Sequence, residues 1–165
     1  MPDCPDGSIR IRNDLVPGDI GSIIHLHGKI YAEEYGFDNT FEPYVAGPLS
    51  DFVLNRTDRD RIWIAECELK VRGSIAIVRF SDTVAQLRWL ILHPDIRGRG
   101  LGMRLVRDAV TFSRESAYES IFLWTVSHLK AATHLYKSMG FECTETRTEP
   151  NWGQMLTEER YDLIF

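Results

Sequence analysis

The sequence predicts one α/β domain of the α+β kind over residues 1–165. Two patterns predict this fold class: short runs in which apolar and polar residues alternate as in strands, and longer runs with the apolar spacing of amphipathic helices. The third observation is that no linker, repeat or low-complexity tract divides the chain. A chain of 165 residues buries roughly 70% of the surface of its unfolded form, so we expect a single core.

Seven runs have the composition of strands. The run at residues 8–12 alternates apolar and polar side chains. Three later runs follow one another with short turns around Arg72-Gly73 and Ser81-Asp82, which is typical of an antiparallel meander. The expected strands are residues 8–12, 61–68, 74–80, 86–92, 120–126, 143–148 and 161–165.

Four runs have the periodicity of helices. Apolar residues recur at helical spacing from Ile20 to Tyr31, and Gly36 stands where the pattern stops, as expected of a C-terminal cap. Gly47-Pro48 predicts a kink or a division into two pieces in the second helix, because proline removes a backbone donor. The expected helices are residues 17–35, 41–54, 100–114 and 129–139.

Charge and composition exclude several classes of protein. The 19 basic and 24 acidic residues give a net charge of −5, which disfavours nucleic-acid binding because phosphate neutralisation needs a basic surface. No run approaches the ~18 consecutive apolar residues of a membrane span. The first residues lack the basic start and the apolar stretch of a secretory signal. We therefore expect a cytoplasmic protein that binds neither nucleic acid nor membrane.

The three cysteines, Cys4, Cys67 and Cys143, lie far apart in the sequence. Their number and spacing match neither a paired disulfide framework nor the close Cys/His spacing of a zinc site. His25 and His27 are neighbours on an expected helix, where side chains two positions apart diverge, so a shared metal is not expected there. The sequence predicts free thiols and no metal.

The segment that begins at Leu90 carries the clearest chemical signal, because a strand runs through a glycine-rich turn directly into a helix. The turn consists of Arg97, Gly98, Arg99, Gly100, Leu101 and Gly102. The first amides of a helix have no partner within it and lie at the positive end of its dipole, so they bind anions. Glycines let the backbone approach the anion, and the two arginines can add charge-assisted contacts. The segment predicts a phosphate-bearing ligand.

Three kinds of phosphate-binding loop compete for this segment. A P-loop requires a lysine after its last glycine, and none follows Gly100 or Gly102. A dinucleotide fingerprint requires Gly-x-Gly-x-x-Gly, whereas the glycines here alternate from Gly98 to Gly102. The pattern Arg97-x-x-Gly100-x-Gly102 instead resembles the signature of the GNAT superfamily, in which such a loop grips the pyrophosphate of acetyl-CoA.

The surrounding sequence also resembles GNAT proteins. The lead-in of Leu90, Leu92 and Pro94 is similar to the family's fourth strand. Beyond the loop, the segment around Tyr136 resembles the family's Ala-x-x-Leu-Tyr-x-x-x-Gly-Phe helix. Further short motifs, among them one at Trp152, resemble the acetyltransferase domains that are fused to MarR-type regulators.

The resemblance implies a GNAT fold, which is a mixed, mostly antiparallel sheet of about seven strands flanked by about four helices. It also implies acetyl-CoA as co-substrate and no metal. In this family the strands on either side of the loop splay apart and main-chain groups hold the pantetheine arm. The cofactor-binding residues implied are Leu90, Leu92, Arg97, Gly98, Arg99, Gly100, Leu101 and Gly102.

Two side chains are candidates for the chemistry. Tyr136 matches the family's tyrosine that donates a proton to the leaving thiolate. Glu66, on an expected strand, is a candidate for the base that takes the proton of the amine. Glu68, Arg88 and His93 are other possible participants, and a water relay is an alternative.

The expected activity is transfer of an acetyl group from acetyl-CoA to a primary amine by direct attack in a ternary complex. A small-molecule amine is the expected acceptor, and a peptide is the alternative. A CoA-binding regulatory module with weak turnover is a second alternative. The sequence identifies neither the acceptor nor the oligomeric state, and a homodimer remains an option.

Overall fold

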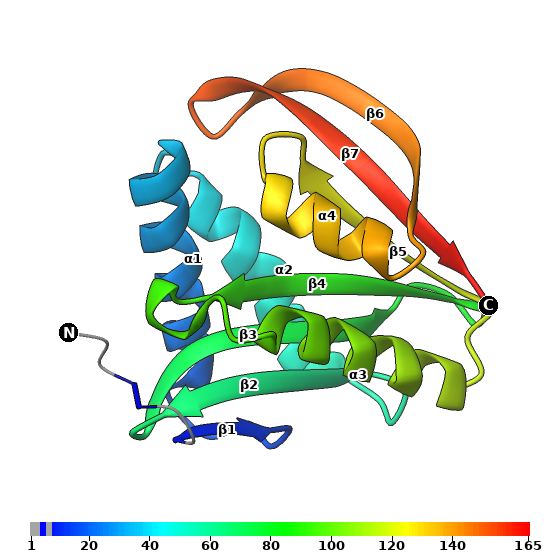
Figure 1. Cartoon of the computed structure of the whole chain (residues 1–165), viewed down its shortest axis with the longest axis horizontal. Coiled ribbons are helices and arrows are strands. Elements are labelled where there is room, and N and C mark those ends of the chain that lie inside the picture. Colours follow the sequence, from blue (N-terminus) through cyan, green and yellow to red (C-terminus); the bar gives the residue numbers. More distant parts are fainter. Residues whose placement is uncertain (1–3, 6–7) are drawn as a thin grey trace.

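The computed structural model describes residues 4–5 and 8–165. Within these residues, seven strands form a mixed sheet in the order β1-β2-β3-β4-β5-β7-β6 (Figure 1). Neighbouring strands are antiparallel except for β4 and β5, which are parallel. The strands are β1 (Ile9–Arg12), β2 (Arg61–Cys67), β3 (Lys70–Arg79), β4 (Val84–Leu92), β5 (Ser120–Val126), β6 (Glu142–Asn151) and β7 (Gln154–Ile164).

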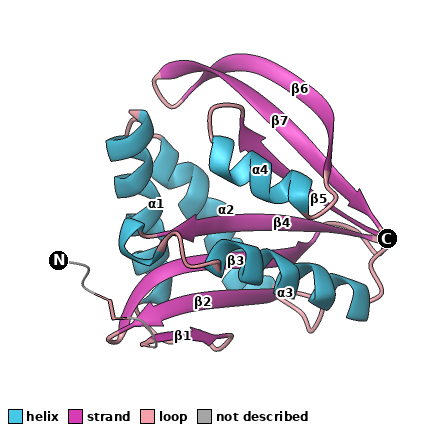
Figure 2. Ribbon diagram, in the orientation of Figure 1, coloured by secondary structure: helices cyan, strands magenta, loops and turns pink. Residues whose placement is uncertain are grey.

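Helices cover both faces of this sheet (Figure 2). On one face α1 (Asp19–Tyr35) packs against α2 (Phe41–Asn55), and on the other lie α3 (Leu101–Glu115) and α4 (Lys130–Ser138). A short 3-10 helix, η1 (Pro94–Ile96), follows β4. Among the described residues, no helix combines the length and the hydrophobicity needed to span a membrane. The predicted fold class is confirmed.

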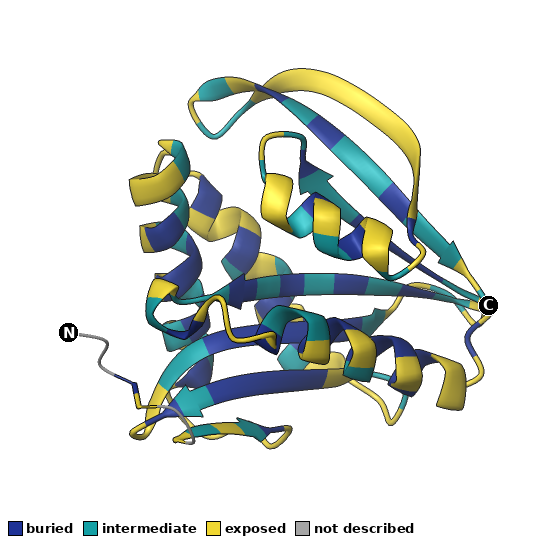
Figure 3. Ribbon diagram, viewed as in Figure 1, coloured by how far each residue is buried: buried dark blue, intermediate teal, exposed yellow. Residues whose placement is uncertain are grey.

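The central strands divide their side chains between two cores. In β2, Ile62 and Ile64 pack with α1 and α2, whereas Trp63 and Ala65 pack with α3. This division follows from the strand geometry, in which successive side chains point to opposite faces. Figure 3 shows the result: the central strands are buried, and the edge strand β6 is exposed along most of its length.

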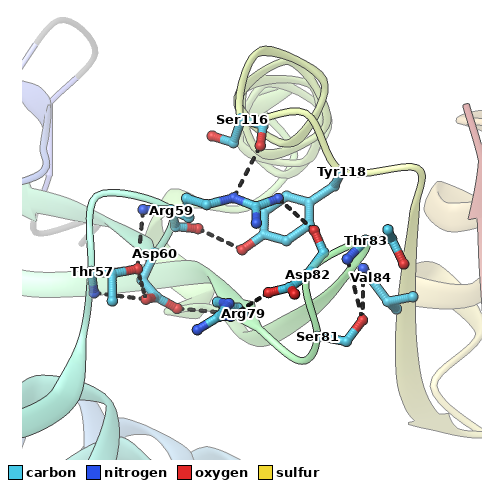
Figure 4. Close-up of polar contacts among 10 residues, drawn as sticks. All are labelled: Thr57, Arg59, Asp60, Arg79, Ser81, Asp82, Thr83, Val84, Ser116 and Tyr118. Atoms are coloured by element: carbon cyan, nitrogen blue, oxygen red, sulfur yellow. Dashed lines mark hydrogen bonds and ion pairs between the residues drawn. The ribbon is translucent and has the colours of Figure 1, made fainter.

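At one end of the sheet, where β4 and β5 are hydrogen-bonded, three loops meet around Arg59 (Figure 4). The Arg59 guanidinium lies 4.1 Å from the centre of the Tyr118 ring. It donates hydrogen bonds to the carbonyl oxygens of Ser116, at 3.1 Å, and Asp82, at 2.9 Å. The Tyr118 hydroxyl donates to the Arg59 carbonyl at 3.0 Å. We call this region the closed end, and these polar groups find their partners within the protein.

The turn between β2 and β3 differs from the sequence expectation. It lies at Glu68-Leu69, whose φ angles of 50° and 63° are left-handed, and not at Arg72-Gly73. Gly73 lies inside β3, where a Cβ atom would be 2.7 Å from the carbonyl oxygen of Ile91. Glycine therefore marks a close approach of two strands at this position, a signal that is easily mistaken for a turn.

The second helix is also different from the expectation. α2 runs without interruption past Pro48, so the predicted division into two pieces is wrong. Val45 and Leu49, on either side of this proline, and Phe52, one turn further, are all buried in the same core. Their shared packing holds the turns before and after the proline in one helix, because tertiary contacts outweigh local propensity.

Cys4 and Cys67 form a disulfide, so the prediction of three free thiols is wrong. The two residues are 63 positions apart in the sequence, and their Cα atoms are 6.1 Å apart. Pairing of β1 with β2 places Ile9 opposite Cys67 and so brings the segment before β1 close to the end of β2. Cysteine spacing does not reveal this pairing, because it depends on which strands are neighbours. Cys143 is exposed and unpaired.

Candidate active site

A cavity of about 390 Å³ lies beside β4 at the end of the sheet opposite to the closed end. This size is within the usual range of small-molecule sites, about 300–1,000 Å³. Its lining comes from α1, α2, β4, the glycine-rich turn, β5, α4 and the β6–β7 hairpin. We call this region the open end.

The cavity exists because β4 and β5 separate. Their parallel pairing covers only residues 84–86 opposite residues 120–122. Beyond this point the two strands diverge (Figure 1), and residues 86–92 and 123–126 line the cavity from its two sides. The edge of β4 that faces β5 has no strand partner there, so its main-chain groups are available to an extended ligand. The splay implied by the family resemblance is present.

A bulge in β4 lies beside this gap. Ser74 of β3 pairs with Ile91, and Ala76 pairs with Arg88, so β4 has one residue more than β3 between the two pairs. Trp89 lies in the bulge with a left-handed φ of 52°, and its carbonyl accepts a hydrogen bond from the Ser74 hydroxyl at 2.7 Å. A bulky residue adopts this conformation only when its surroundings hold it there.

The glycine-rich turn forms the mouth of the cavity. Gly98 and Gly100 have left-handed φ angles of 73° and 72°, and Gly100 caps α3, with no side chain bonded at this terminus. The first α3 amide with a carbonyl partner is the fourth one, which donates to Gly100 at 3.1 Å. A Cβ atom at Gly102 would lie 3.4 Å from the side chain of Leu135, so this glycine serves close packing. Uncapped amides and the positive end of a helix dipole are chemically suited to an anion.

The two arginines of the turn point in different directions. Arg97 lines the cavity, and its guanidinium forms an ion pair with Glu34 of α1, with contacts of 2.8 and 3.1 Å. Its Nε also donates to the Leu92 carbonyl at 2.8 Å. Arg99 is not part of the cavity lining, and its guanidinium donates to the carbonyl of Cys4 at 3.0 Å. Of these two guanidinium groups, the one that lines the cavity is therefore that of Arg97.

Tyr136 of α4 lines the same cavity, and only 5% of its surface is exposed. Its hydroxyl makes no hydrogen bond with the described residues. Burial, helped by the nearby phenol of Tyr31, raises the pKa of Tyr136 well above its usual range. The Tyr136 phenol therefore stays protonated near neutral pH, as a proton donor must be.

One wall of the cavity is aromatic. Tyr31 and Phe41 lie 4.6 Å apart between ring centres, and Tyr44 and Trp152 lie 4.9 Å apart. These rings come from both N-terminal helices and from the turn between β6 and β7, which meet only in the folded chain. The aromatic wall consists of Tyr31, Tyr35, Phe37, Phe41, Tyr44 and Trp152.

The family model described as "Acetyltransferase (GNAT) family" matches residues 24–141, which include the splayed strands, the glycine-rich turn and Tyr136. The chain belongs to the GNAT acetyltransferase family. An uncharacterized N-acetyltransferase of Schizosaccharomyces pombe is 30% identical to this GNAT chain over 146 residues, which cover 84% of the chain and 85% of the relative.

Two further matches agree with this assignment. An uncharacterized N-acetyltransferase of Methanocaldococcus jannaschii is 28% identical over 153 residues. The match covers 88% of this GNAT chain but only 65% of the archaeal protein. The structure of a putative acetyltransferase from Salmonella typhimurium, solved with its cofactor acetyl-CoA, has a TM-score of 0.76 at 16% identity, covering 95% of this chain and 94% of that one. The latter likeness concerns the fold.

The structure does not bring Glu66 to the GNAT cavity. Glu66 accepts a hydrogen bond from Arg12 at 2.9 Å, and the same guanidinium forms two 2.7 Å bonds with Asp19. Burial would raise the pKa of Asp19, but hydrogen bonds from Arg12 and the Val16 amide outweigh it, so the pKa is lowered. Hydrogen bonding to Asp19 likewise raises the pKa of Arg12. The charges of Arg12, Asp19 and Glu66 are therefore paired with one another, outside the cavity.

Another carboxylate, Glu158 of β7, lines the cavity. It is 5% exposed, and one of its oxygens accepts hydrogen bonds from Arg147 and Asn151, each at 3.3 Å. Burial and the neighbouring Glu149 raise the pKa of Glu158, although Arg147 opposes the shift. The sequence contains no signal for Glu158, because it lies in the polar run Thr157-Glu158-Glu159-Arg160, where no apolar residue indicates which side chains face inwards. Among the described residues, no group of three or more His, Cys, Asp or Glu is placed to hold a metal.

Proposed function

We propose that this protein transfers an acetyl group from acetyl-CoA to a primary amine, most simply that of a small molecule, within a ternary complex. The observation that carries the proposal is the uncapped start of α3, which opens directly onto the gap between β4 and β5. A phosphate bound at a helix N-terminus and an arm lying along unpaired strand edges are the two contacts that a CoA thioester needs. Membership of the GNAT family supports the same cofactor.

The proposed cofactor residues divide by role. Main-chain amides of Gly98, Gly100, Leu101 and Gly102 hold the pyrophosphate, and Arg97 adds charge once its pairing with Glu34 yields to the phosphate. Main-chain groups of Leu90 and Leu92 hold the pantetheine arm. Arg99 supports the loop from outside through its bond to the N-terminal segment.

The proposed chemistry uses two buried groups of the cavity. Glu158 accepts the proton that the amine loses, and Tyr136 donates a proton to the departing thiolate. As the nitrogen–carbon bond forms, the carbon–sulfur bond breaks, so an amine and a thioester become an amide and a thiol. Amides of the β4 bulge stabilise the oxyanion that forms on the acetyl oxygen. Glu158 replaces Glu66 in this proposal because Glu66 is already paired with Arg12 outside the cavity.

Three finer expectations remain predictions. Kinship with the MarR-fused acetyltransferase domains rests on short motifs such as the one at Trp152. A single domain over residues 1–165 is supported by a sheet that extends from β1 to β7. A cytoplasmic location is supported by composition, but the Cys4–Cys67 disulfide points the other way because disulfides persist mainly in oxidising compartments.

The test combines calorimetry with a thiol-release assay. Acetyl-CoA should bind the purified protein, and Arg97→Glu should weaken binding by at least about tenfold, because it places a negative charge beside the phosphate. Thiol release should appear with at least one member of a panel of amino acids, arylalkylamines, polyamines and peptides. Binding without release from any amine would support the regulatory-module alternative, release with peptides alone would support a peptide acceptor, and an absence of binding would reject the proposal.

A further inference from the structure

The β4 bulge reverses the side-chain alternation of the strand. Before the bulge, Ala85 and Leu87 belong to the core under α3, whereas after it Trp89 belongs to the core under α1 and α2. Arg88 pairs with Ala76, whose side chain also belongs to the α1–α2 core. Two consecutive residues, Arg88 and Trp89, therefore point to the same face, with the guanidinium 5.0 Å from the Trp89 ring.

This geometry leaves Arg88 without a carboxylate partner. It lines the cavity, makes no hydrogen bond or ion pair with a described residue, and its nitrogen atoms are not sealed from the cavity. Burial lowers the pKa of Arg88, and the nearby phenol of Tyr44 opposes the shift. Arginine nevertheless remains charged in proteins, so a desolvated cation faces the cavity.

The ion pairs of the charged residues that line the cavity also distinguish Arg88 from the others. Arg97 is neutralised by Glu34 at 2.8 Å, and Glu158 by Arg147 at 3.3 Å. Arg147 also lies 3.5 Å from Glu149, so its charge is shared between two carboxylates, whereas Arg88 has no ion-pair partner among the described residues. Desolvated charges are costly unless they are paired, so the site favours a ligand that brings one negative charge to this position.

The surroundings of Arg88 also define the body of such a ligand. Burial raises the pKa of Tyr44 of the aromatic wall, and nearby Arg88 partly opposes this shift. Tyr44 also packs 4.9 Å from Trp152. Tyr44 retains 46% exposure, so part of its ring is free to contact a ligand. Flat aromatic surfaces favour apolar or aromatic groups stacked against them.

We propose that Arg88 binds a carboxylate of the acceptor, so that the preferred acceptor is an amine that also carries a carboxylate and an apolar or aromatic body, as an aromatic amino acid does. This inference rests on the proposed N-acetyl transfer. Arg88 lies two residues before Leu90 on the same strand, so a carboxylate held by Arg88 leaves the amine beside the gap where the thioester would lie. Arg88 is thus a residue that determines specificity.

The test uses three probes of one shape: phenylalanine, phenethylamine without the carboxylate, and 3-phenylpropanoate without the amine. The expected kcat/KM for phenylalanine exceeds that for phenethylamine by at least about tenfold, the usual value of a charge-assisted hydrogen bond. Binding to the CoA-loaded protein, followed by calorimetry, should show the same order, and 3-phenylpropanoate should compete with phenylalanine without being consumed.

Variants of Arg88 test whether this residue causes the preference for phenylalanine over phenethylamine. Arg88→Met should reduce the phenylalanine-to-phenethylamine ratio to about one, and Arg88→Lys should restore part of it, because lysine keeps the charge without the planar fork. Arg61→Met is the matched control, because Arg61 is exposed and stacks on Phe112 at 4.2 Å, outside the cavity lining. It should leave the ratio unchanged.

The two proposals fail in different ways. If phenethylamine reacts and binds as well as phenylalanine in the unmodified protein, the role of Arg88 is wrong while acetyl transfer stands. The same conclusion follows if no carboxylate-bearing amine binds but another amine releases thiol. If Arg88-dependent binding is found but no amine releases thiol, acetyl transfer is wrong and the carboxylate site stands. The comparison of the three probes needs no variant, so a poorly folded Arg88→Met protein does not prevent a decision.

Discussion

The two ends of the sheet contain similar side chains in opposite circumstances. At the closed end, Arg59 and Tyr118 stack and donate their hydrogen bonds to main-chain carbonyls, and β4 and β5 are paired (Figure 4). At the open end, Arg88 and Tyr136 line a cavity, have no hydrogen-bond partner among the described residues, and flank separated strands. The same residue types thus have hydrogen-bond partners at the closed end and, among the described residues, none at the open end.

The difference shows which polar groups matter for function. A buried group with all its bonds made contributes to stability, and replacing it leaves a partner unsatisfied. A buried polar group without partners reduces stability unless a ligand binds it, so the presence of such a group in a cavity indicates a binding role. The Arg12–Asp19–Glu66 cluster carries three charges, but they are paired with one another, so we expect this cluster to contribute to stability.

The largest expected effect separates the two ends directly. Tyr136→Phe should lower kcat by about 10²–10⁴-fold, the range of general acid catalysis, with little change in Tm. Tyr118→Phe should keep kcat and lower stability by about 1 kcal/mol, because it removes the bond to the Arg59 carbonyl. Thiol release and thermal unfolding of both variants measure this contrast. Equal kcat in the two variants would remove Tyr136 from the mechanism.

A second effect concerns the base. Glu158→Gln should lower kcat/KM by about 10²-fold or more. In the unmodified protein kcat/KM should rise with pH through the raised pKa of Glu158, because only the ionised carboxylate accepts a proton. The variant should lose this limb of the pH profile. Glu142→Gln, at an exposed position of β6, is the control and should retain it. An unchanged profile in Glu158→Gln would favour a water relay.

A third effect concerns His27, a group of the open end for which we expect a role in stability and none in catalysis. His27 lines the cavity, but its Nδ1 lies 2.8 Å from the Ile23 carbonyl, and burial lowers the pKa of His27 from 6.5 to about 4. Below pH 6.5 the unfolded chain binds a proton that the folded chain does not. Stability should therefore fall between about pH 6.5 and 4, by up to about 3 kcal/mol.

Denaturant unfolding as a function of pH measures this slope. His27→Gln should flatten the curve between pH 7 and 4.5, relative to the unmodified protein, because it removes the titrating group. His134→Gln, at an exposed position of α4, should leave the slope as it is. An identical slope in all three proteins would show that other groups account for the acid sensitivity.

The smallest expected effect compares two glycines. Gly100→Ala should lose roughly 1–2 kcal/mol of stability, because its φ of 72° is left-handed, and should weaken acetyl-CoA binding by crowding the amides of α3. Gly21→Ala should instead gain about 0.5–1 kcal/mol, because Gly21 lies in α1 with nothing within 4 Å of the added carbon and no proline after it. Calorimetry and thermal unfolding test both. Tighter acetyl-CoA binding by Gly100→Ala would contradict the assigned phosphate site.

Much of the architecture was predictable from local patterns. Alternation and helical periodicity located the strands and helices, and Gly36 and Gly100 marked helix ends, because a left-handed backbone favours glycine, which has no Cβ atom. The turn from Arg97 to Gly102 predicted an anion site for the same reason, and this prediction is tested by acetyl-CoA binding. Errors arose where a local signal had a non-local cause, as at Gly73, which permits the approach of β4, and at Pro48, which neighbouring packing tolerates.

Sequence alone determined the elements, the glycine-rich turn and a tyrosine in a suitable helix, because backbone preference and periodicity act over a few residues. Tertiary structure decided which side chains meet. A single extra residue in β4 turned Arg88 and Trp89 to the same face, strand pairing joined Cys4 to Cys67, and a β7 carboxylate reached the cavity while Glu66 was bound by Arg12. These outcomes depend on strand register and on contacts between distant segments, which no local pattern encodes.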